Sequence, residues 1–356
     1  MKFLSVSIDE AKGQILGHNI AGNNGRRVLR KGRALSDVDI ATLRELGRHA
    51  VYIAQLDSGD VDENLAAQRI ADAVTGSGVR CSAAATGRVN IFAQDLGIVR
   101  VDTERLVALN SCAGVTLATM LSHTPARAGK MVATLKIIPY ALPESTVQQA
   151  ERLSTNEAGS LSAPTHLANG PTIWMTPLTP KRVGLILSGS VMARDRIVDS
   201  FKNALTPRLE ALAATIEQID FVPLDDETGE MQLADMLLRH MSAGVNLVIL
   251  AGETAIMDRY DIAPRAVERA GGEITCFGAP VDPGNLLMLA YHGQTPIVGA
   301  PGCSRSPKDN IIDLVLPRLL AGDRLTDGDI IHLGHGGLLE DVPERPLPRS
   351  QIGNLL

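Results

Sequence analysis

The sequence has few aromatic residues and no paired cysteines. Aromatic side chains make up 3% of the 356 residues, with a single tryptophan, so we expect no platform that stacks the bases of single-stranded nucleic acid. The net charge of −6 also argues against a general nucleic-acid binder. The four cysteines are far apart and form no CxxC pair, which argues against a disulfide framework or a zinc site and fits reduced thiols in a cytosol.

Long apolar runs are missing as well. No window approaches about 18 uninterrupted apolar residues, so no membrane-spanning helix is expected. The N-terminal stretch carries an early acidic pair and no long apolar core, unlike a signal peptide. We therefore expect a cytoplasmic protein without membrane or nucleic-acid partners. Hydrophobic residues still make up 45% of the chain, enough for real cores, and the length suits two or three domains.

Periodicity divides the chain into five segments. We expect a small α/β unit, a helix followed by a β-rich region, a linker rich in Ser, Thr and Pro, an α/β domain, and an extended appendage rich in Gly, Pro and Arg. These segments span residues 1–60, 61–145, 146–180, 181–322 and 323–356, in that order. In the first segment a helix is predicted over 37–46, because Ser36 is a good N-cap and Gly47 can end it. Val38 and Leu43 should lie near its inner face.

From Arg182 onward, predicted strands and helices alternate. The strands are expected at 183–187, 216–222, 245–250, 273–277, 286–290 and 295–299. The helices are expected at about 196–215, 230–243, 264–270 and 307–320. Such alternation implies a three-layer αβα domain of the α/β class, with a mostly parallel sheet covered by helices on both faces.

Three strands of this domain run into loops of small residues, at 188–190, 251–254 and 300–304. We call these loops the first, second and third corners. The carboxyl ends of strands line the ligand crevice of open α/β sheets. Small residues let backbone N–H groups approach a ligand, and helices that begin just afterward favour anions. Three converging corners predict a phosphate or pterin site, although any one corner alone could be a tight turn.

Short segments across about 180–322 carry a family pattern in order and spacing. They are Ser188-Gly189-Ser190, Asp199-Ser200-Phe201, the Gly252-Glu253-Thr254 loop, Asp261-Ile262-Ala263-Pro264, Asp282-Pro283-Gly284-Asn285, Pro301-Gly302-Cys303-Ser304 and 315–322. In these segments the C-terminal part resembles the molybdopterin-binding domain shared by molybdopterin molybdotransferases, molybdopterin adenylyltransferases and gephyrin. The resemblance implies that the corners bind molybdopterin or its adenylate, with magnesium and molybdate as further ligands. It also implies a homo-oligomer, most simply a dimer.

The resemblance, together with the chemistry of the third corner, assigns cofactor-binding roles to residues of the corners and of the helices that follow them. These residues are Ser188, Gly189, Ser190, Asp199, Ser200, Gly252, Thr254, Pro301, Gly302, Ser304, Arg305 and Lys308. The last three offer a hydroxyl and two cations at a predicted helix start, which would make a phosphate cradle. Their alternative is a basic first turn, which the helix dipole disfavours.

Three carboxylates are the candidates for catalysis. Asp261 matches the family's functional acid and, with Glu253, would hold magnesium, which needs oxygen ligands. The alternative for Asp261 is an N-cap of the helix that contains Pro264. Asp258 is a third candidate, with a solvated loop carboxylate as its alternative. Glu253 stands where the family has glycine, so it either points at a ligand or blocks the site.

Other departures from the family pattern affect the expected activity. Ser190 replaces an acid, Phe201 replaces an asparagine, and Cys303-Ser304 replaces Asn-Pro. These changes put metal insertion in doubt, whereas pterin binding through backbone N–H groups should survive them. Cys303 has no histidine nearby in sequence, so a small buried thiol is a better account than a nucleophile.

The N-terminal half resembles the upstream region of a molybdotransferase-like subfamily in short pieces. They are Lys31-Gly32 with Leu35 and Asp39, Gly87-Arg88-Val89-Asn90, Thr116-Leu117-Ala118-Thr119 and Lys136-Ile137-Ile138-Pro139. Gly87-Arg88 and Lys136 could equally be turn and strand-end residues. Near the C-terminus, His332 and His335 lack further ligands at metal-site spacing.

Three functions follow as hypotheses. The first is a molybdopterin-binding protein of molybdenum cofactor biosynthesis that inserts molybdate into the pterin dithiolene. The second is a non-catalytic carrier or scaffold that holds the cofactor for a partner molybdenum hydroxylase. The third is an unrelated nucleotide-binding protein on a similar sheet, because a fold does not dictate its function.

Overall fold

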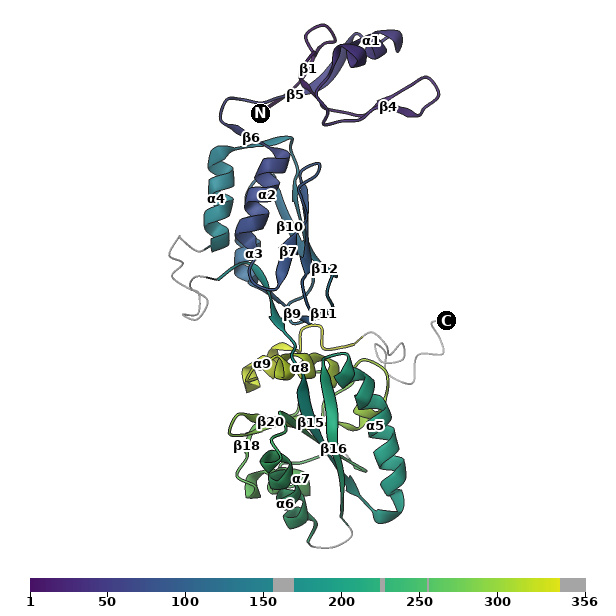
Figure 1. Ribbon diagram of the computed structural model, residues 1–356. Helices are drawn as coiled ribbons and strands as arrows, with labels where there is room; N and C mark the ends of the chain where they lie inside the picture. Colours follow the sequence, from purple (N-terminus) through teal and green to yellow (C-terminus); the bar gives the residue numbers. More distant parts are fainter. Residues whose placement is uncertain (156–169, 225–227, 255, 340–356) are drawn as a thin grey trace, which may run out of the picture. The chain divides into compact units, whose positions relative to one another are not determined.

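The computed structural model describes residues 1–155, 170–224, 228–254 and 256–339. The chain divides into two compact units, Met1–Thr176 and Pro177–Leu356, whose elements are labelled in Figure 1. Within the described ranges no helix is both long enough and apolar enough to cross a membrane.

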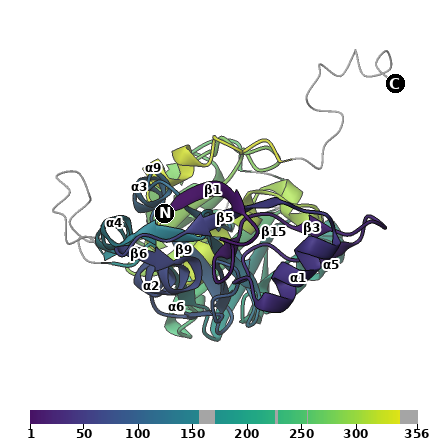
Figure 2. The ribbon, with the colours of Figure 1, turned by 90° about the horizontal axis from the view of Figure 1, so that it is seen from above.

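The first unit begins with a three-stranded antiparallel sheet of order β1-β5-β2. Strands β1 (Lys2–Ser7) and β5 (Ala50–Gln55) run side by side (Figures 1 and 2), and β2 (Ile15–Leu16) pairs with the other edge of β5. A hairpin of β3 (Ile20–Ala21) and β4 (Arg27–Leu29) follows. Their apolar side chains form one core with those of helix α1.

Helix α1 (Asp37–Glu45) begins directly after Ser36, its predicted N-cap. The Ser36 hydroxyl oxygen accepts from the backbone N–H of Asp39, and the Asp39 carboxylate accepts from the Ser36 N–H. Leu43 is buried, but Val38 is 74% exposed, so its predicted place at the inner face is wrong. Ile40 takes that place, because residues three apart on a helix share a face.

The rest of the first unit is a sheet of order β10-β12-β8-β7 packed against helices. Its strands are β7 (Val79–Cys81), β8 (Arg88–Ala93), β10 (Val115–Thr119) and β12 (Met131–Ile137). The helices are α2 (Glu63–Val74), α3 (Thr103–Asn110) and α4 (Glu144–Thr155). Two smaller sheets pair β6 (Asp60–Asp62) with β13 (Ala141–Pro143), and β9 (Gly97–Val101) with β11 (Pro125–Ala126) and β14 (Ile173–Pro177).

The prediction of a linker over 146–180 is wrong at both ends. Helix α4 occupies the first part and buries Val147 and Ala150 completely, while β14, which contains Trp174, adds a strand beside β9. Val147 and Ala150 are three residues apart, as on one face of a helix. The Ser and Thr residues around them make this helical pattern hard to recognise in the sequence. Residues 156–169 of the predicted linker lie outside the described residues.

The second unit contains a six-stranded sheet of order β16-β15-β17-β20-β19-β18. The strands are β15 (Lys181–Gly189), β16 (Ala214–Pro223), β17 (Leu247–Gly252), β18 (Glu273–Phe277), β19 (Met288–His292) and β20 (Thr295–Gly299). Only β19 runs against its neighbours. The prediction of a mostly parallel sheet in an α/β domain is confirmed.

Helices cover both faces of this sheet, as predicted. Helices α6 (Gly229–Ser242) and α7 (Ile262–Arg269) pack on one face through residues such as Leu233, Leu237 and Val267. Figure 1 shows α5 (Arg194–Glu210) on the other side, and α8 (Ile311–Leu320) follows β20 in the chain. The parallel order brings the carboxyl ends of β15, β17 and β20 to the same edge.

The predicted extended appendage is partly folded. Helix α9 (Asp327–His332) begins at a capping box formed by Thr326 and Asp329, and it buries Ile330. Leu338 then bridges in parallel to Asp282. The appendage prediction is therefore wrong up to residue 339, because a short capped helix with one apolar anchor gives little periodic signal. Residues 340–356 lie outside the described residues.

Candidate functional site

The three corners meet at the carboxyl edge of the C-terminal sheet. Strand β17 lies between β15 and β20, with Ser188 paired to Gly252 and Leu250 paired to Gly299. The backbone N–H of Ala300 donates to the carbonyl of Leu250 at 2.7 Å. The predicted convergence is therefore confirmed, and it follows directly from the order of the parallel strands.

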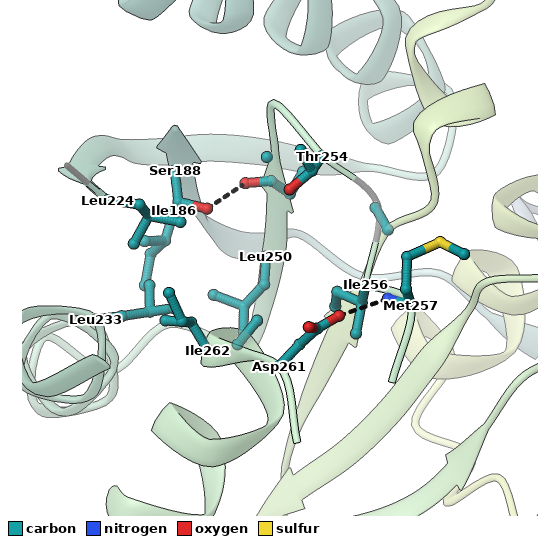
Figure 3. Close-up of a pocket in the computed structure, with 14 residues that line it drawn as sticks. Ile186, Ser188, Leu224, Leu233, Leu250, Thr254, Ile256, Met257, Asp261 and Ile262 are labelled. Atoms are coloured by element: carbon teal, nitrogen blue, oxygen red, sulfur yellow. Dashed lines mark hydrogen bonds between the residues drawn. The ribbon is translucent and has the colours of Figure 1, made fainter. Parts of the chain in front are cut away.

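A pocket of about 230 Å³ opens beside the first two corners (Figure 3). Its polar lining comes from Ser188, Thr254 and Asp261, and Ala300 of the third corner completes the rim. Its apolar walls are Ile186, Leu224, Leu233, Leu250, Ile256 and Ile262. A cleft that combines apolar walls with convergent polar groups at strand ends is a usual setting for a small-molecule ligand.

Asp261 precedes α7 but does not cap it, so the capping alternative is wrong. Its Oδ2 accepts hydrogen bonds from the backbone N–H groups of Met257 at 2.6 Å and Asp258 at 3.1 Å. Its Oδ1 has no hydrogen-bond partner in the part of the chain that the structure describes. The carboxylate is thus fixed by the loop and lines the pocket (Figure 3).

Glu253 turns toward the first corner and lies outside the lining of the pocket. Its Oε2 accepts from the backbone N–H of Ser190 at 2.9 Å, and its Oε1 pairs with Arg196 at 3.3 Å. The hydrogen bonds from Ser190 lower the pKa of Glu253, and the charges of Arg196 and Arg305 lower it further. The expectation that the backbone N–H groups of this corner stay available to a ligand is wrong for Ser190.

The carboxylates predicted for magnesium do not come together as a preformed metal site. Both Glu253 oxygens and one Asp261 oxygen are already held by groups of the chain. Asp258 is exposed, and its Oδ1 accepts from the Tyr260 N–H at 2.7 Å. Among the residues described, no three His, Cys, Asp or Glu side chains are grouped to hold a metal ion.

Asp199 and Ser200 do not lie at a helix start. Helix α5 begins at Arg194, after a short 3-10 turn over Val191–Ala193, so both residues stand in its second turn. The Ser200 hydroxyl donates to the carbonyl of Ile197 at 2.9 Å, and Asp199 is exposed. The helix start expected at this point is therefore wrong, and the backbone N–H groups of these residues lie inside a helix, where such groups are already bonded.

The third corner forms a 3-10 turn over Gly302–Arg305 after Pro301. Arg305 lies 5.1 Å above the ring of Phe201 and donates to the carbonyl of Glu253 at 3.4 Å, which ties this corner to the second. Ser304 is completely buried, and its hydroxyl has no hydrogen-bond partner within the described residues.

The predicted phosphate cradle at this corner is not formed as expected. Helix α8 begins at Ile311 and not near 307, and Asn310 caps it by accepting from the N–H of Ile312. Lys308 is exposed before that cap. A Ser-Arg-Ser-Pro segment resembles a helix start in sequence, but the cap lies after it.

Several residues of the site were not singled out from sequence. Leu224 follows β16 and Leu233 comes from α6, and both line the pocket. Nothing in the sequence separates an apolar pocket wall from an ordinary core position. Arg196, the partner of Glu253, is an exposed cation in a first helical turn and carries no signal either.

The N-terminal resemblance residues are engaged within their own unit. Lys136 donates to the carbonyl of Thr86 at 2.6 Å and pairs with Glu63 at 3.4 Å. The N–H of Gly87, in the left-handed region at φ 67°, donates to the side chain of Asn64. These contacts support the alternative in which they are turn and strand-end residues.

Comparison with known proteins gives two family matches. Residues 184–321 match a family described as "Probable molybdopterin binding domain". Residues 5–55 match a family described as a domain of unknown function. No curated protein matches the chain.

Solved structures with matching chains include a molybdenum cofactor biosynthesis protein from Pyrococcus furiosus, 11% identical with a TM-score of 0.24. That match covers 93% of this chain and 65% of the other, so this chain spans less than two thirds of its length. Two structures of molybdopterin biosynthesis MoeA protein from Pyrococcus horikoshii are 13% and 10% identical, with TM-scores of 0.28 and 0.27. These matches cover 90% and 93% of this chain, and each covers 75% of the matched Pyrococcus horikoshii chain.

The family match covers the sheet, the three corners and the pocket between β15 and α7. It coincides with the segments that carried the sequence resemblance. Residues 184–321 of the C-terminal unit therefore match the molybdopterin-binding domain family by sequence, over the same sheet and corners that form the site.

Proposed function

We propose that the pocket beside the first two corners binds the pterin of molybdopterin or of its adenylate, in the assembly or delivery of molybdenum cofactor. The observation that carries this proposal is the position of Asp261. Its carboxylate is fixed by two backbone N–H groups at the wall of the pocket, where strands end in the segment that matches the molybdopterin-binding domain family.

The lining suits a flat heterocycle that has N–H groups on its edge. Leu250, Ile256 and Ile262 offer apolar contact, and burying the apolar surface of a ring against them stabilises the complex. A carboxylate accepts hydrogen bonds from ring N–H and amino groups, and such charge-assisted bonds are the strong ones. Because the loop already holds Asp261, little side-chain freedom is lost when a ligand binds.

Glu253, Asp258 and Asp261 do not form a preformed site for magnesium, so we assign the chain no reaction step that uses a bound magnesium ion. For molybdate insertion, the chain's own contribution would be to bind and orient the pterin, since positioning alone can lower a barrier substantially. Molybdate and the pterin are substrates in this scheme.

A second candidate function is the non-catalytic carrier, which the contact between Glu253 and Ser190 favours. At the first corner the chain has a serine where the family has an acid, and the nearby carboxylate of Glu253 is bonded to Ser190 and Arg196. Restoring a glycine and an acid with Glu253→Gly and Ser190→Asp tests the two candidates. A gain in molybdate insertion supports a weakened enzyme, and unchanged insertion with intact pterin binding supports a carrier.

The partner proposals follow from the ligand. We propose a homodimer and a handover of the cofactor to a molybdoenzyme. Sedimentation equilibrium of the full chain measures the first, and transfer of bound pterin to an apo molybdenum hydroxylase measures the second. A monomer at all concentrations contradicts the dimer.

The direct test of the main proposal is an equilibrium titration of the full chain with molybdopterin, with and without Mg²⁺ and molybdate. We expect saturable binding in all conditions. A chain that ignores the pterin but co-elutes with a nucleotide would show that the third hypothesis, a nucleotide-binding protein, is correct.

A further inference from the structure

We propose that Glu253 is an internal competitor of the ligand, and this inference rests on the proposed function. Its carboxylate accepts the hydrogen bond of the Ser190 N–H. In our proposal, an anionic group of a bound molecule would otherwise accept this bond. The free protein therefore closes its own first corner, and a ligand that uses this corner must displace Glu253.

The first line of support is the space above Gly189. This glycine has φ 154°, and a Cβ built on it would lie 2.7 Å from the Cβ of Glu253 and 3.0 Å from its Oε2. The side chain of Glu253 thus lies directly against a glycine backbone. An uncovered glycine of this kind would let a ligand approach the main chain closely.

The second line of support is the charge around the carboxylate. Arg196 pairs with it at 3.3 Å from α5, and Arg305 lies close enough to favour its ionised form while donating to the Glu253 carbonyl. Two guanidinium groups and a backbone N–H form the environment that binds an oxyanion. In this protein, an oxygen anion of the chain itself fills that environment.

The arrangement also shows how the site would open. The Arg196 side chain is 73% exposed, whereas Ser190 is only partly exposed. A carboxylate displaced from Ser190 can keep its Arg196 partner in solvent, so opening breaks the hydrogen bonds from Ser190 and not the ion pair. The affinity for an anion at this corner is then lower than it would be without Glu253.

The experiment compares the wild-type chain with Glu253→Gln and Glu253→Gly, using inorganic pyrophosphate as the anion probe. Glu253→Gln keeps the side-chain size and removes its charge, whereas Glu253→Gly also clears the space. Selective ¹⁵N-serine labelling follows the Ser190 amide resonance in each protein. The matched control is Glu217→Gln, which removes an exposed carboxylate paired with Arg182 at the opposite end of β15.

We expect the Ser190 amide resonance to move in both Glu253 variants and not in the control. We expect pyrophosphate to bind the glycine variant about ten- to hundredfold more tightly than wild type, as the loss of a competing charge-assisted hydrogen bond predicts. The glutamine variant should show a smaller gain. Equal pyrophosphate affinity in wild type and both variants would overturn the inference.

Parallel titrations with molybdopterin keep this inference separable from the proposed function. If molybdopterin fails to bind any protein but the variants gain pyrophosphate affinity, the proposed function fails and the internal competitor stands. If molybdopterin binds wild type and Glu253→Gly equally and pyrophosphate affinity is unchanged, the proposed function stands and the competitor role is wrong.

Discussion

The carboxylate of Asp261 accepts a hydrogen bond at 2.6 Å from the backbone N–H of Met257, four residues before it. It accepts none from the first turn of α7, the helix that Asp261 precedes. An acid at the first residue before a helix normally accepts from the first turn. Here the same side chain fixes the loop that forms one wall of the pocket. Within the described residues the other carboxylate oxygen has no hydrogen-bond partner, so we expect it to accept a hydrogen bond from a ligand in the pocket.

Replacing Asp261 should weaken pterin binding. Asp261→Ala removes the only carboxylate among the described residues that line the pocket, and we expect an affinity loss of about tenfold or more, as for a charge-assisted hydrogen bond. Asp261→Asn should retain part of the loop's hydrogen bonding but lose the charge. Isothermal titration with molybdopterin measures both variants.

The matched control is Asp258→Ala in the same loop. Asp258 is exposed and lines no part of the pocket, so its removal should change the affinity less than about threefold, as expected for a surface change. Similar losses for Asp258→Ala and Asp261→Ala would contradict a specific role for Asp261.

Arg69 joins α2 to α4 and should stabilise the first unit. Its guanidinium group donates to both oxygens of Glu144 and both oxygens of Glu151, at distances from 2.8 to 2.9 Å. Arg69→Ala should lower the free energy of unfolding by about 1–3 kcal/mol, and Arg69→Lys by less, because a lysine keeps the charge but not the fork. Urea unfolding measures both values.

The control for Arg69 is Arg152→Ala. Arg152 is exposed on α4, and its Nε donates to the carbonyl of Gln148. Its removal should change the unfolding free energy by no more than about 0.5 kcal/mol. Equal effects of the two alanine substitutions would mean that the hydrogen bonds of Arg69 to Glu144 and Glu151 add nothing to stability.

Gly184 should not tolerate a side chain. A Cβ at this position would lie 2.1 Å from Nδ1 of His240, a buried ring whose Nε2 bonds to Asp220 at 2.7 Å. Gly184→Ala should therefore destabilise the second unit by about 1–3 kcal/mol, the usual cost of overpacking. Gly59→Ala is the control, since nothing lies within 4 Å of a Cβ there. A neutral Gly184→Ala, judged by thermal unfolding, would contradict this packing.

Asp329 should make stability depend on pH in the acid range. Burial alone would raise its pKa, but hydrogen bonds from Thr326 and Arg318 outweigh this and lower the pKa to about 2. Because the pKa is lower in the folded state, the stabilisation is present above about pH 4 and is lost as the pH falls through 2.

Chemical unfolding at pH 5 and pH 3 measures this effect. Asp329→Asn should reduce the loss of stability between these pH values by at most about 1 kcal/mol, since solvent screens a partly exposed pair. An identical pH dependence in the variant and the wild type would show that Asp329 contributes nothing in this range.

Much of the C-terminal fold could be predicted from sequence. Buried parallel strands are short apolar runs that end in small residues, and their order along the chain implies that the corners share one edge. The corners at Ser188, Gly252 and Ala300 are adjacent for this reason. Helix starts were less predictable, because a cap such as Asn310 is a local contact that competes with other polar residues nearby.

Side-chain directions were the part that sequence could not supply. Glu253 was expected either to point at a ligand or to block the site, and its bond to Ser190 depends on how two separate loops are juxtaposed. Asp261 was correctly placed before a helix, but its choice of Met257 as donor depends on the path of the preceding loop. Leu233 required knowledge of which core residues face an open space.

The central claim is that the pterin binds in the pocket formed by the first two corners, and methyl NMR of the full chain tests it most directly. With ¹³C-methyl labels on isoleucine, molybdopterin should shift the resonances of Ile186, Ile256 and Ile262, which line the pocket. Ile312 of α8 and Ile137 of the first unit lie outside that lining and should not move. Saturable shifts confined to the pocket methyls are the predicted result. Shifts that spare those three residues while molybdopterin binds elsewhere would contradict it.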